Sequence, residues 1–181
     1  MRKSILLHLL VVFAVAAMMT PAVFAADEKA APAEAPKIPG VGDMIPEFSL
    51  PSLDGKEVTS KDIAGGKPVS VVIFMSTACS ACQAEIAAVD QILGKYGDKV
   101  DMFLISVDVR GADTVKPYSE TYKYKATYLL DTKFTVPRKF GFAATPSVVV
   151  IDKSGKIILK KAGYQVGDEE AIQEAVIKFA K

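Results

Sequence analysis

The stretch that decides the fold is Val69-Ser70-Val71-Val72-Ile73-Phe74-Met75-Ser76-Thr77-Ala78-Cys79-Ser80-Ala81-Cys82. Its first half, residues 69–75, is almost continuously apolar and β-branched, which is typical of a strand buried on both faces of a sheet. Ser76 and Thr77 end the strand and are residue types that cap helices. We therefore predict a central strand that leads directly into a helix carrying the two cysteines.

The residues after the cysteines predict an amphipathic helix. Apolar side chains recur at helical spacing, and polar side chains fall between them. The apolar positions are Cys82, Ile86, Val89 and Leu93. We expect about four turns, ending near Gly97.

The rest of the chain alternates between strand and helix patterns. A hairpin is expected around Asp54-Gly55, joining segments near residues 48–50 and Val58. After the cysteine helix we expect a strand at 102–107, a helix at 113–124, a short segment near Tyr128, a helical turn at 134–140, a hairpin of 148–151 with 156–159, and a helix at 168–180. Strands separated by helices indicate an α/β domain whose central mixed sheet is flanked by helices on both faces, with the last hairpin adding antiparallel edge pairing.

The first 25 residues have the pattern of a secretory signal peptide. Arg2 and Lys3 precede an apolar run of fifteen residues, from Ile5 to Met19, whereas a membrane-spanning helix needs roughly 20. Small residues before the cut suit cleavage after Ala25. Retention of the segment as an uncleaved anchor is the alternative.

The mature chain would then have two parts. Residues 26–40 are rich in Ala, Pro and charge and are predicted to form a flexible linker. Residues 41–181 form the folded domain. We expect an exported protein of the periplasm or cell envelope that is not inserted in the membrane after cleavage.

Charge and histidine content exclude several functions. The 181 residues carry 22 basic and 21 acidic side chains. Removal of Arg2 and Lys3 leaves 20 basic residues and a net charge of −1, without the clustered positive charge that nucleic acid or an anionic membrane requires. The same cleavage removes His8, the single histidine, which excludes histidine-based catalysis. We expect no cofactor and no metal.

The spacing of Cys79 and Cys82 makes the two sulfurs unequal. At a strand-to-helix junction, Cys79 meets the unpaired N–H groups and the positive end of the helix, which stabilise a thiolate. Cys82 shares the apolar face of Ile86 and Val89 and should be shielded. Dithiol exchange needs this asymmetry, because an accessible sulfur attacks a disulfide and a protected one resolves the intermediate. We assign Cys79 as nucleophile and Cys82 as resolving thiol.

Two passive roles for the cysteines stay open as alternatives. A structural disulfide stabilises most when it closes a long loop, whereas this one closes a single helical turn. Zinc sites use four ligands in most structural cases, and the mature chain offers only two cysteines and no histidine.

Several separated motifs together resemble one family. They are Gly42-Asp43-Met44-Ile45-Pro46-Glu47-Phe48-Ser49-Leu50, Asp54-Gly55-Lys56, Phe74 through Cys82 with Glu85, Ala144-Thr145-Pro146, Val148 to Asp152, and Gly155-Lys156. In this order they are similar to the TlpA/ResA-type thioredoxin-like proteins of the AhpC/TSA-redoxin superfamily. The resemblance implies a thioredoxin fold with an N-terminal β-hairpin extension and an inserted α/β element.

The resemblance also implies roles for three further residues. Pro146 would be a cis-proline facing the disulfide, and Thr145 before it would present backbone groups to a substrate chain; an edge-strand proline is the alternative. Glu85 would be a general base for Cys82 if burial raises its pKa. A solvated glutamate on the helix surface is the other interpretation.

Three positions depart from the family pattern. Ala78 and Ala81 stand where Trp and Pro are usual, and Ile73 stands where thioredoxin has a buried acidic residue. The reduction potential therefore does not follow from the resemblance. Because Ser80 and Ala81 add no charge that would stabilise a thiolate, we expect a reductant.

Two other clusters have ordinary explanations. The tyrosines at 118, 122, 124 and 128 are expected to pack against one another, with substrate contact as the alternative. The lysines at 153, 156, 160 and 161 are expected to be solvated residues of an edge strand.

The leading hypothesis is an exported disulfide reductase. Its substrates would be cysteine-containing envelope proteins, with apocytochrome c as one example, and a membrane thiol reductase would supply its electrons, as the resemblance implies. A peroxiredoxin-like peroxidase is the second hypothesis, since Ser76 lies three residues before Cys79. A non-enzymatic binding module with a structural disulfide is the third.

Overall fold

The computed structural model describes residues 37–180. The predicted signal peptide and residues 26–36 of the predicted linker lie outside this range. Among the described residues, no helix combines the length and apolar character that a membrane span requires.

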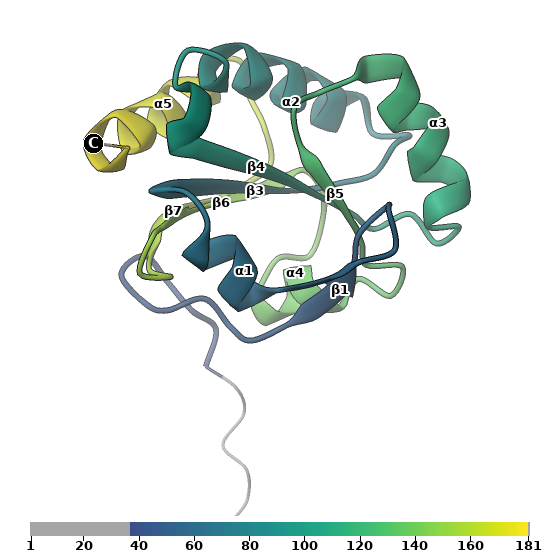
Figure 1. Ribbon diagram of the computed structural model, residues 1–181, viewed down its shortest axis with the longest axis horizontal. Coiled ribbons are helices and arrows are strands. Elements are labelled where there is room, and N and C mark those ends of the chain that lie inside the picture. Colours follow the sequence, from purple (N-terminus) through teal and green to yellow (C-terminus); the bar gives the residue numbers. More distant parts are fainter. Residues whose placement is uncertain (1–36, 181) are drawn as a thin grey trace, which may run out of the picture. The chain divides into compact units, whose positions relative to one another are not determined.

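The centre of the fold is a five-stranded mixed sheet in the order β5-β4-β3-β6-β7 (Figure 1). The strands are β3 (Val69–Met75), β4 (Val100–Ser106), β5 (Thr127–Leu130), β6 (Ser147–Asp152) and β7 (Ile157–Ala162). β3 pairs in parallel with β4 and antiparallel with β6, and all seven of its residues are buried. The predicted central strand at 69–75 is confirmed.

Helices cover both faces of the sheet, as predicted. One face carries α2 (Ser80–Leu93), α3 (Ala112–Tyr122) and α5 (Asp168–Phe179), and the other carries α1 (Ser60–Gly65) and α4 (Thr135–Lys139) (Figure 1). Alternate side chains of β3 enter the two cores: Val71 and Ile73 pack on the α2 side, and Val72 and Phe74 on the α1 side.

The final hairpin adds antiparallel pairing at one edge of the sheet, as predicted. Of its two strands, β6 lies inside the sheet next to β3, and β7 is the edge strand. β6 is buried on both faces because its run Val148-Val149-Val150-Ile151 is apolar at every position. The hairpin thus places the start of β6 beside the end of β3.

An N-terminal hairpin precedes the sheet, as predicted. β1 (Ser49–Pro51) pairs antiparallel with β2 (Glu57–Thr59), and an isolated bridge from Ser52 to Leu129 joins the hairpin to β5. Helix α1 follows at once and was not predicted. It has six residues, too few for an apolar period, and its signal is the capping box in which Thr59 and Asp62 bond each other's backbone N–H groups.

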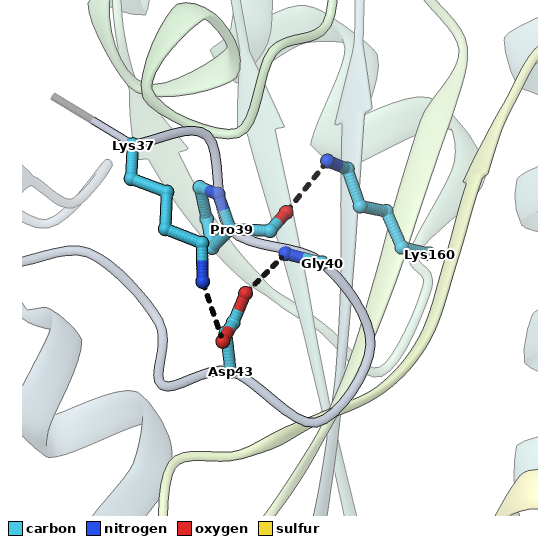
Figure 2. A network of polar contacts seen from close by, with 5 residues as sticks. All are labelled: Lys37, Pro39, Gly40, Asp43 and Lys160. Atoms are coloured by element: carbon cyan, nitrogen blue, oxygen red, sulfur yellow. Dashed lines mark hydrogen bonds and ion pairs between the residues drawn. The ribbon is translucent and has the colours of Figure 1, made fainter. Parts of the chain in front are cut away.

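The folded part begins before residue 41. The Lys160 ammonium donates to the Pro39 carbonyl at 2.8 Å, and Asp43 accepts from the Gly40 N–H at 2.9 Å and pairs with Lys37 (Figure 2). Backbone bonds from Gly42 to the carbonyl of Ile157, and from Ile157 back to that of Asp43, continue this contact. Residues 39–43 therefore lie along the start of the edge strand β7.

Asp131 holds the start of helix α4 in place. This buried carboxylate follows β5 and accepts bonds from the N–H groups of Thr135 and Val136 and from the Thr135 hydroxyl, at 2.7–2.9 Å. These are the donors that a helix start leaves without partners. Asp131 therefore anchors the start of α4.

We predict that Asp131→Ala lowers the free energy of unfolding by about 1–3 kcal/mol, because it leaves the buried Val136 N–H and the partly buried Thr135 N–H without their acceptor. Urea unfolding measures the loss. The control is Asp98→Ala, at an exposed position of the short 3-10 helix η1 (Gly97–Lys99), which should change the free energy by less than about 0.5 kcal/mol. Equal effects of the two substitutions would contradict the anchoring role.

Candidate active site

Cys79 and Cys82 form a disulfide at the junction between β3 and α2, with their Cα atoms 5.2 Å apart. Cys79 is partly exposed, whereas Cys82 is fully buried among Ile86, Val89 and the sheet. The asymmetry expected from the spacing is therefore present in the geometry.

Cys79 is itself the N-cap of α2. The Cys82 N–H donates to Cys79 Sγ at 3.1 Å, and the Gln83 N–H donates to the Cys79 carbonyl at 3.1 Å. A donor at a helix N-terminus that points at the sulfur stabilises a thiolate when the disulfide opens. The expectation that Ser76 or Thr77 caps the helix is wrong, because their side chains are engaged elsewhere.

Ser76 and Thr77 bind a carboxylate from the neighbouring strand end. Ser76 Oγ donates to Asp108 at 2.7 Å, and the Thr77 N–H donates at 2.9 Å. Asp108 follows β4, the parallel neighbour of β3, so the two strands bring these groups to one edge of the sheet. Asp108 was missed from the sequence, although polar residues after adjacent parallel strands were the available signal.

Glu85 lies one helical turn after Cys82 and is completely buried. Neither of its carboxylate oxygens has a hydrogen-bond partner within residues 37–180. Burial raises the pKa of Glu85 to about 7, with a further raising contribution from Asp168 and an opposing one from Lys161. The interpretation as a solvated surface glutamate is therefore wrong.

The charges that act on Glu85 come from β7 and α5. Lys161 on β7 forms an ion pair with Asp168 in the first turn of α5, and Tyr164 lies in the loop between them. The neighbouring Lys160 points to the opposite face, over the Phe142 ring. Lys160 and Lys161 are half-buried, so the expectation of solvated lysines holds only for Lys153 and Lys156.

The Thr145–Pro146 peptide bond is cis, as the resemblance implied. Pro146 is buried and immediately precedes β6, whose Ser147 pairs with Phe74 near the end of β3. The Gly163 N–H donates a hydrogen bond to the Pro146 carbonyl at 2.8 Å. No hydrogen bond within residues 37–180 uses the backbone N–H or C=O of Thr145.

The tyrosine cluster packs as expected. The rings of Tyr118 and Tyr122 are 4.5 Å apart, and those of Tyr122 and Tyr124 are stacked at 5.6 Å. Tyr118 and Tyr128 are buried in the core beside α2, and burial, followed by the neighbouring Tyr124, raises the pKa of Tyr128 to about 12. The rings of Tyr118 and Tyr128 fill the space between α3, β5 and α2, and Tyr122 is exposed.

A cysteine pair at the start of the helix that follows the central strand of a mixed sheet is typical of thioredoxin-like thiol–disulfide oxidoreductases. Known proteins that are similar to this chain belong to the same class. Residues 41–160 match the model of the AhpC/TSA family, and the chain belongs to that family. Within it, the chain is of the TlpA/ResA type and is a thiol–disulfide oxidoreductase.

Curated relatives support this assignment. Thiol-disulfide oxidoreductase ResA of Bacillus thuringiensis subsp. konkukian is 29% identical over 140 residues, which cover 77% of this chain and 78% of the relative. Thioredoxin-like protein YneN of Bacillus subtilis is 26% identical over 120 residues, covering 64% of this chain and 68% of the relative.

Solved structures support the thioredoxin-like fold. A crystal structure from Chlorobium tepidum, assigned as thiol:disulfide interchange protein DsbE, has a TM-score of 0.70 at 24% identity and covers 78% of this chain and 99% of its own. A thiol:disulfide interchange protein from Bacteroides sp. has a TM-score of 0.64 at 23% identity and covers 78% and 90%. The predicted fold is confirmed.

We predict that Glu85→Gln stabilises the oxidised protein at high pH. The native state keeps the Glu85 proton up to about pH 7, whereas the unfolded chain loses it near its ordinary pKa of about 4.5. The native state therefore binds more protons across this window, and stability falls as pH rises through it. The variant escapes this loss, so its advantage at pH 8 is on the order of 3 kcal/mol.

Urea unfolding at pH 4.5 and pH 8 checks the effect of Glu85. The advantage of Glu85→Gln should be nearly absent at pH 4.5. The control Glu174→Gln, at an exposed position on α5, should give the same small change at both pH values. An advantage of Glu85→Gln that does not depend on pH would contradict a raised pKa.

We also predict that Lys161 and Asp168 shift the pKa of Glu85 in opposite directions. Lys161→Met should raise it and Asp168→Asn should lower it, following the signs of the removed charges. Carbon-13 NMR titration of the Glu85 carboxyl in the oxidised protein measures both shifts. Lys160→Met, one residue away on the other face, is the control and should leave the titration unchanged.

Proposed function

We propose that this thiol–disulfide oxidoreductase is exported and reduces disulfides in cysteine-containing envelope proteins. The observation that supports it best is the asymmetric pair at the start of α2, with a partly exposed Cys79 that accepts from the Cys82 N–H and a buried Cys82. The signal-peptide pattern of residues 1–25 supports export to the periplasm or cell envelope.

The reaction begins at Cys79. Its thiolate attacks one sulfur of the substrate disulfide, forms a mixed disulfide and releases the other substrate sulfur as a thiolate. Thr145 has a free backbone N–H and C=O on the chain before Pro146, and these groups would bind the substrate backbone beside the attacked sulfur. We therefore assign substrate binding to Thr145 and Pro146.

Cys82 completes the exchange. Its thiol must lose a proton before it attacks Cys79 Sγ, because the thiolate is the nucleophile. Glu85 lies one turn away in the same shielded region, and its pKa of about 7 suits a general base at neutral pH. The second substrate sulfur leaves, and Cys79 and Cys82 close the disulfide seen in the structure.

The electrostatics favour a reductant. A disulfide becomes a strong oxidant when the protein stabilises its thiolate form. Here a single backbone donor faces Cys79 Sγ, the residues between the cysteines are uncharged, and the buried Glu85, once ionised, disfavours a second negative charge on a thiolate. We expect a reduction potential nearer to that of thioredoxin, about −270 mV, than to about −120 mV.

The partners follow from this direction of electron flow. A reductant must be recycled by a donor, which for an exported protein would be a membrane thiol reductase. Apocytochrome c before haem attachment is one substrate with the required cysteine pair. We therefore propose a membrane thiol reductase as the electron donor and apocytochrome c as one substrate.

We predict that Cys82→Ala traps substrates as mixed disulfides on Cys79. The variant retains the attacking thiol but cannot resolve the intermediate, so substrates should be captured from an envelope extract in a form that dithiothreitol releases. Cys79→Ala, which lacks the attacking thiol, is the control and should capture none. Equal capture by both variants would contradict the assignment of roles.

The reduction potential of the unsubstituted chain, measured against a glutathione redox buffer, checks the direction of electron flow. A value close to −120 mV would overturn the reductase proposal in favour of an oxidase. Turnover of hydrogen peroxide that depends on Cys79, with a sulfenic acid in Cys82→Ser, would instead indicate a peroxidase.

A further inference from the structure

Asp108 is a polar hub beside the redox centre. It accepts from Ser76 Oγ at 2.7 Å, from the Thr77 N–H at 2.9 Å, from Thr77 Oγ1 at 3.2 Å and from Ser106 Oγ at 2.7 Å. Its own N–H donates to Ser106 Oγ at 3.1 Å. Four acceptor sites are about the full capacity of a carboxylate, so Asp108 is saturated by this one loop and one strand end.

The sheet explains why a side chain is needed at this position. The backbone register of β3 and β4 ends with Met75 opposite Ser106, and the last backbone bond runs from the Val107 N–H to the Met75 carbonyl at 2.9 Å. Beyond this pair, β3 turns toward α2 and leaves the sheet. Asp108 continues the link between the two strands through its side chain.

The loop that Asp108 binds also holds the nucleophile. The Ser76 carbonyl accepts from the Cys79 N–H at 3.1 Å, and the Thr77 carbonyl accepts from Gln83 Nε2 at 3.0 Å. Ser76 and Thr77 are thus fixed by Asp108 on one side and by Cys79 and Gln83 of the helix start on the other. A shift of this loop would move Cys79 relative to the Cys82 N–H.

We propose that Asp108 is a positioning residue of the redox centre, which holds Ser76 and Thr77 so that Cys79 Sγ stays on the Cys82 N–H. The role matters in the reduced protein. In the oxidised protein the covalent bond fixes both sulfurs, whereas in the dithiol only the loop and the Cys82 N–H hold Cys79 in place. This inference rests on the proposed role of Cys79 as the attacking thiol.

The direction in which removal of Asp108 shifts the pKa of Cys79 distinguishes a positioning role from a purely electrostatic one. If Asp108 acted only through its negative charge, its removal would make the Cys79 thiolate easier to form. If it positions the sulfur, its removal takes the thiolate away from its donor and makes the thiolate harder to form. The other charged groups of the site, Glu85, Lys161 and Asp168, stay unchanged in the variants used.

The test is the pH dependence of Cys79 alkylation by iodoacetamide in the Cys82→Ala background, where one thiol remains. Asp108→Ala should raise the apparent pKa of Cys79 by about one unit, so alkylation at pH 6.5 slows about tenfold. The rate at pH 10, where the thiol is fully ionised, should stay within about twofold. A lowered or unchanged pKa would overturn the proposal.

Two controls exclude a general loss of stability. Ser106→Ala removes both hydrogen bonds between Ser106 and Asp108 but none from Asp108 to the loop, and should leave the pKa of Cys79 unchanged. Asp131→Ala removes another aspartate that follows a strand, and should destabilise the fold without moving that pKa. If Asp108→Ala does not fold, the double variant Ser76→Ala, Thr77→Val removes two of the three loop donors to Asp108 and no charge, and a smaller rise in the pKa of Cys79 is expected.

The measurement is independent of any substrate, so it separates this inference from the proposed function. Insulin disulfide reduction by the unsubstituted chain tests the reductase activity alone. Active wild-type protein with an unmoved Cys79 pKa in Asp108→Ala defeats the positioning role. Inactive wild-type protein with a raised pKa in the variant defeats the reductase proposal and supports the positioning role.

Discussion

Burial of β3 on both faces is the constraint on which the rest of the structure depends. Because each of its seven residues is buried, the strand must lie between β4 and β6 and under helices on both sides. The C-terminal end of β3 then lies beside the start of β6 and the residues that follow β4. The disulfide, Pro146 and Asp108 all lie at this end of the sheet because they adjoin the end of the same strand.

The sequence predicted the elements that have long, unmixed patterns. The apolar strand at 69–75, the cysteine helix and the last helix were found because many residues repeat one period. The run of β6 is apolar at every position, which fits its place between β3 and β7. Helix α1 was missed because six residues hold no period, and the cap at Cys79 was misassigned because serine and threonine precede it.

The residues of the site also divide into those that the sequence predicted and those that it did not. Cys79 and Cys82 carry their own signal in their spacing, and Pro146 and Glu85 were placed by the family resemblance. The burial of Glu85 could not be predicted, because it depends on how α5 packs on α2 and against β7. Asp108 was missed for a related reason: Ser76 and Thr77 are about thirty residues away from it, and only the parallel register of β3 with β4 brings them within bonding distance.

The contact of residues 39–43 with β7 has a consequence for association between molecules. An edge strand presents unpaired backbone groups that can recruit a strand from another chain. Here the N–H and the carbonyl of Ile157, at the start of β7, are hydrogen-bonded to the N-terminal segment. Lys160 and Lys161 place charged side chains on the second half of the strand. The short segment that leads into the domain therefore prevents β7 from pairing with a strand of another molecule at this position.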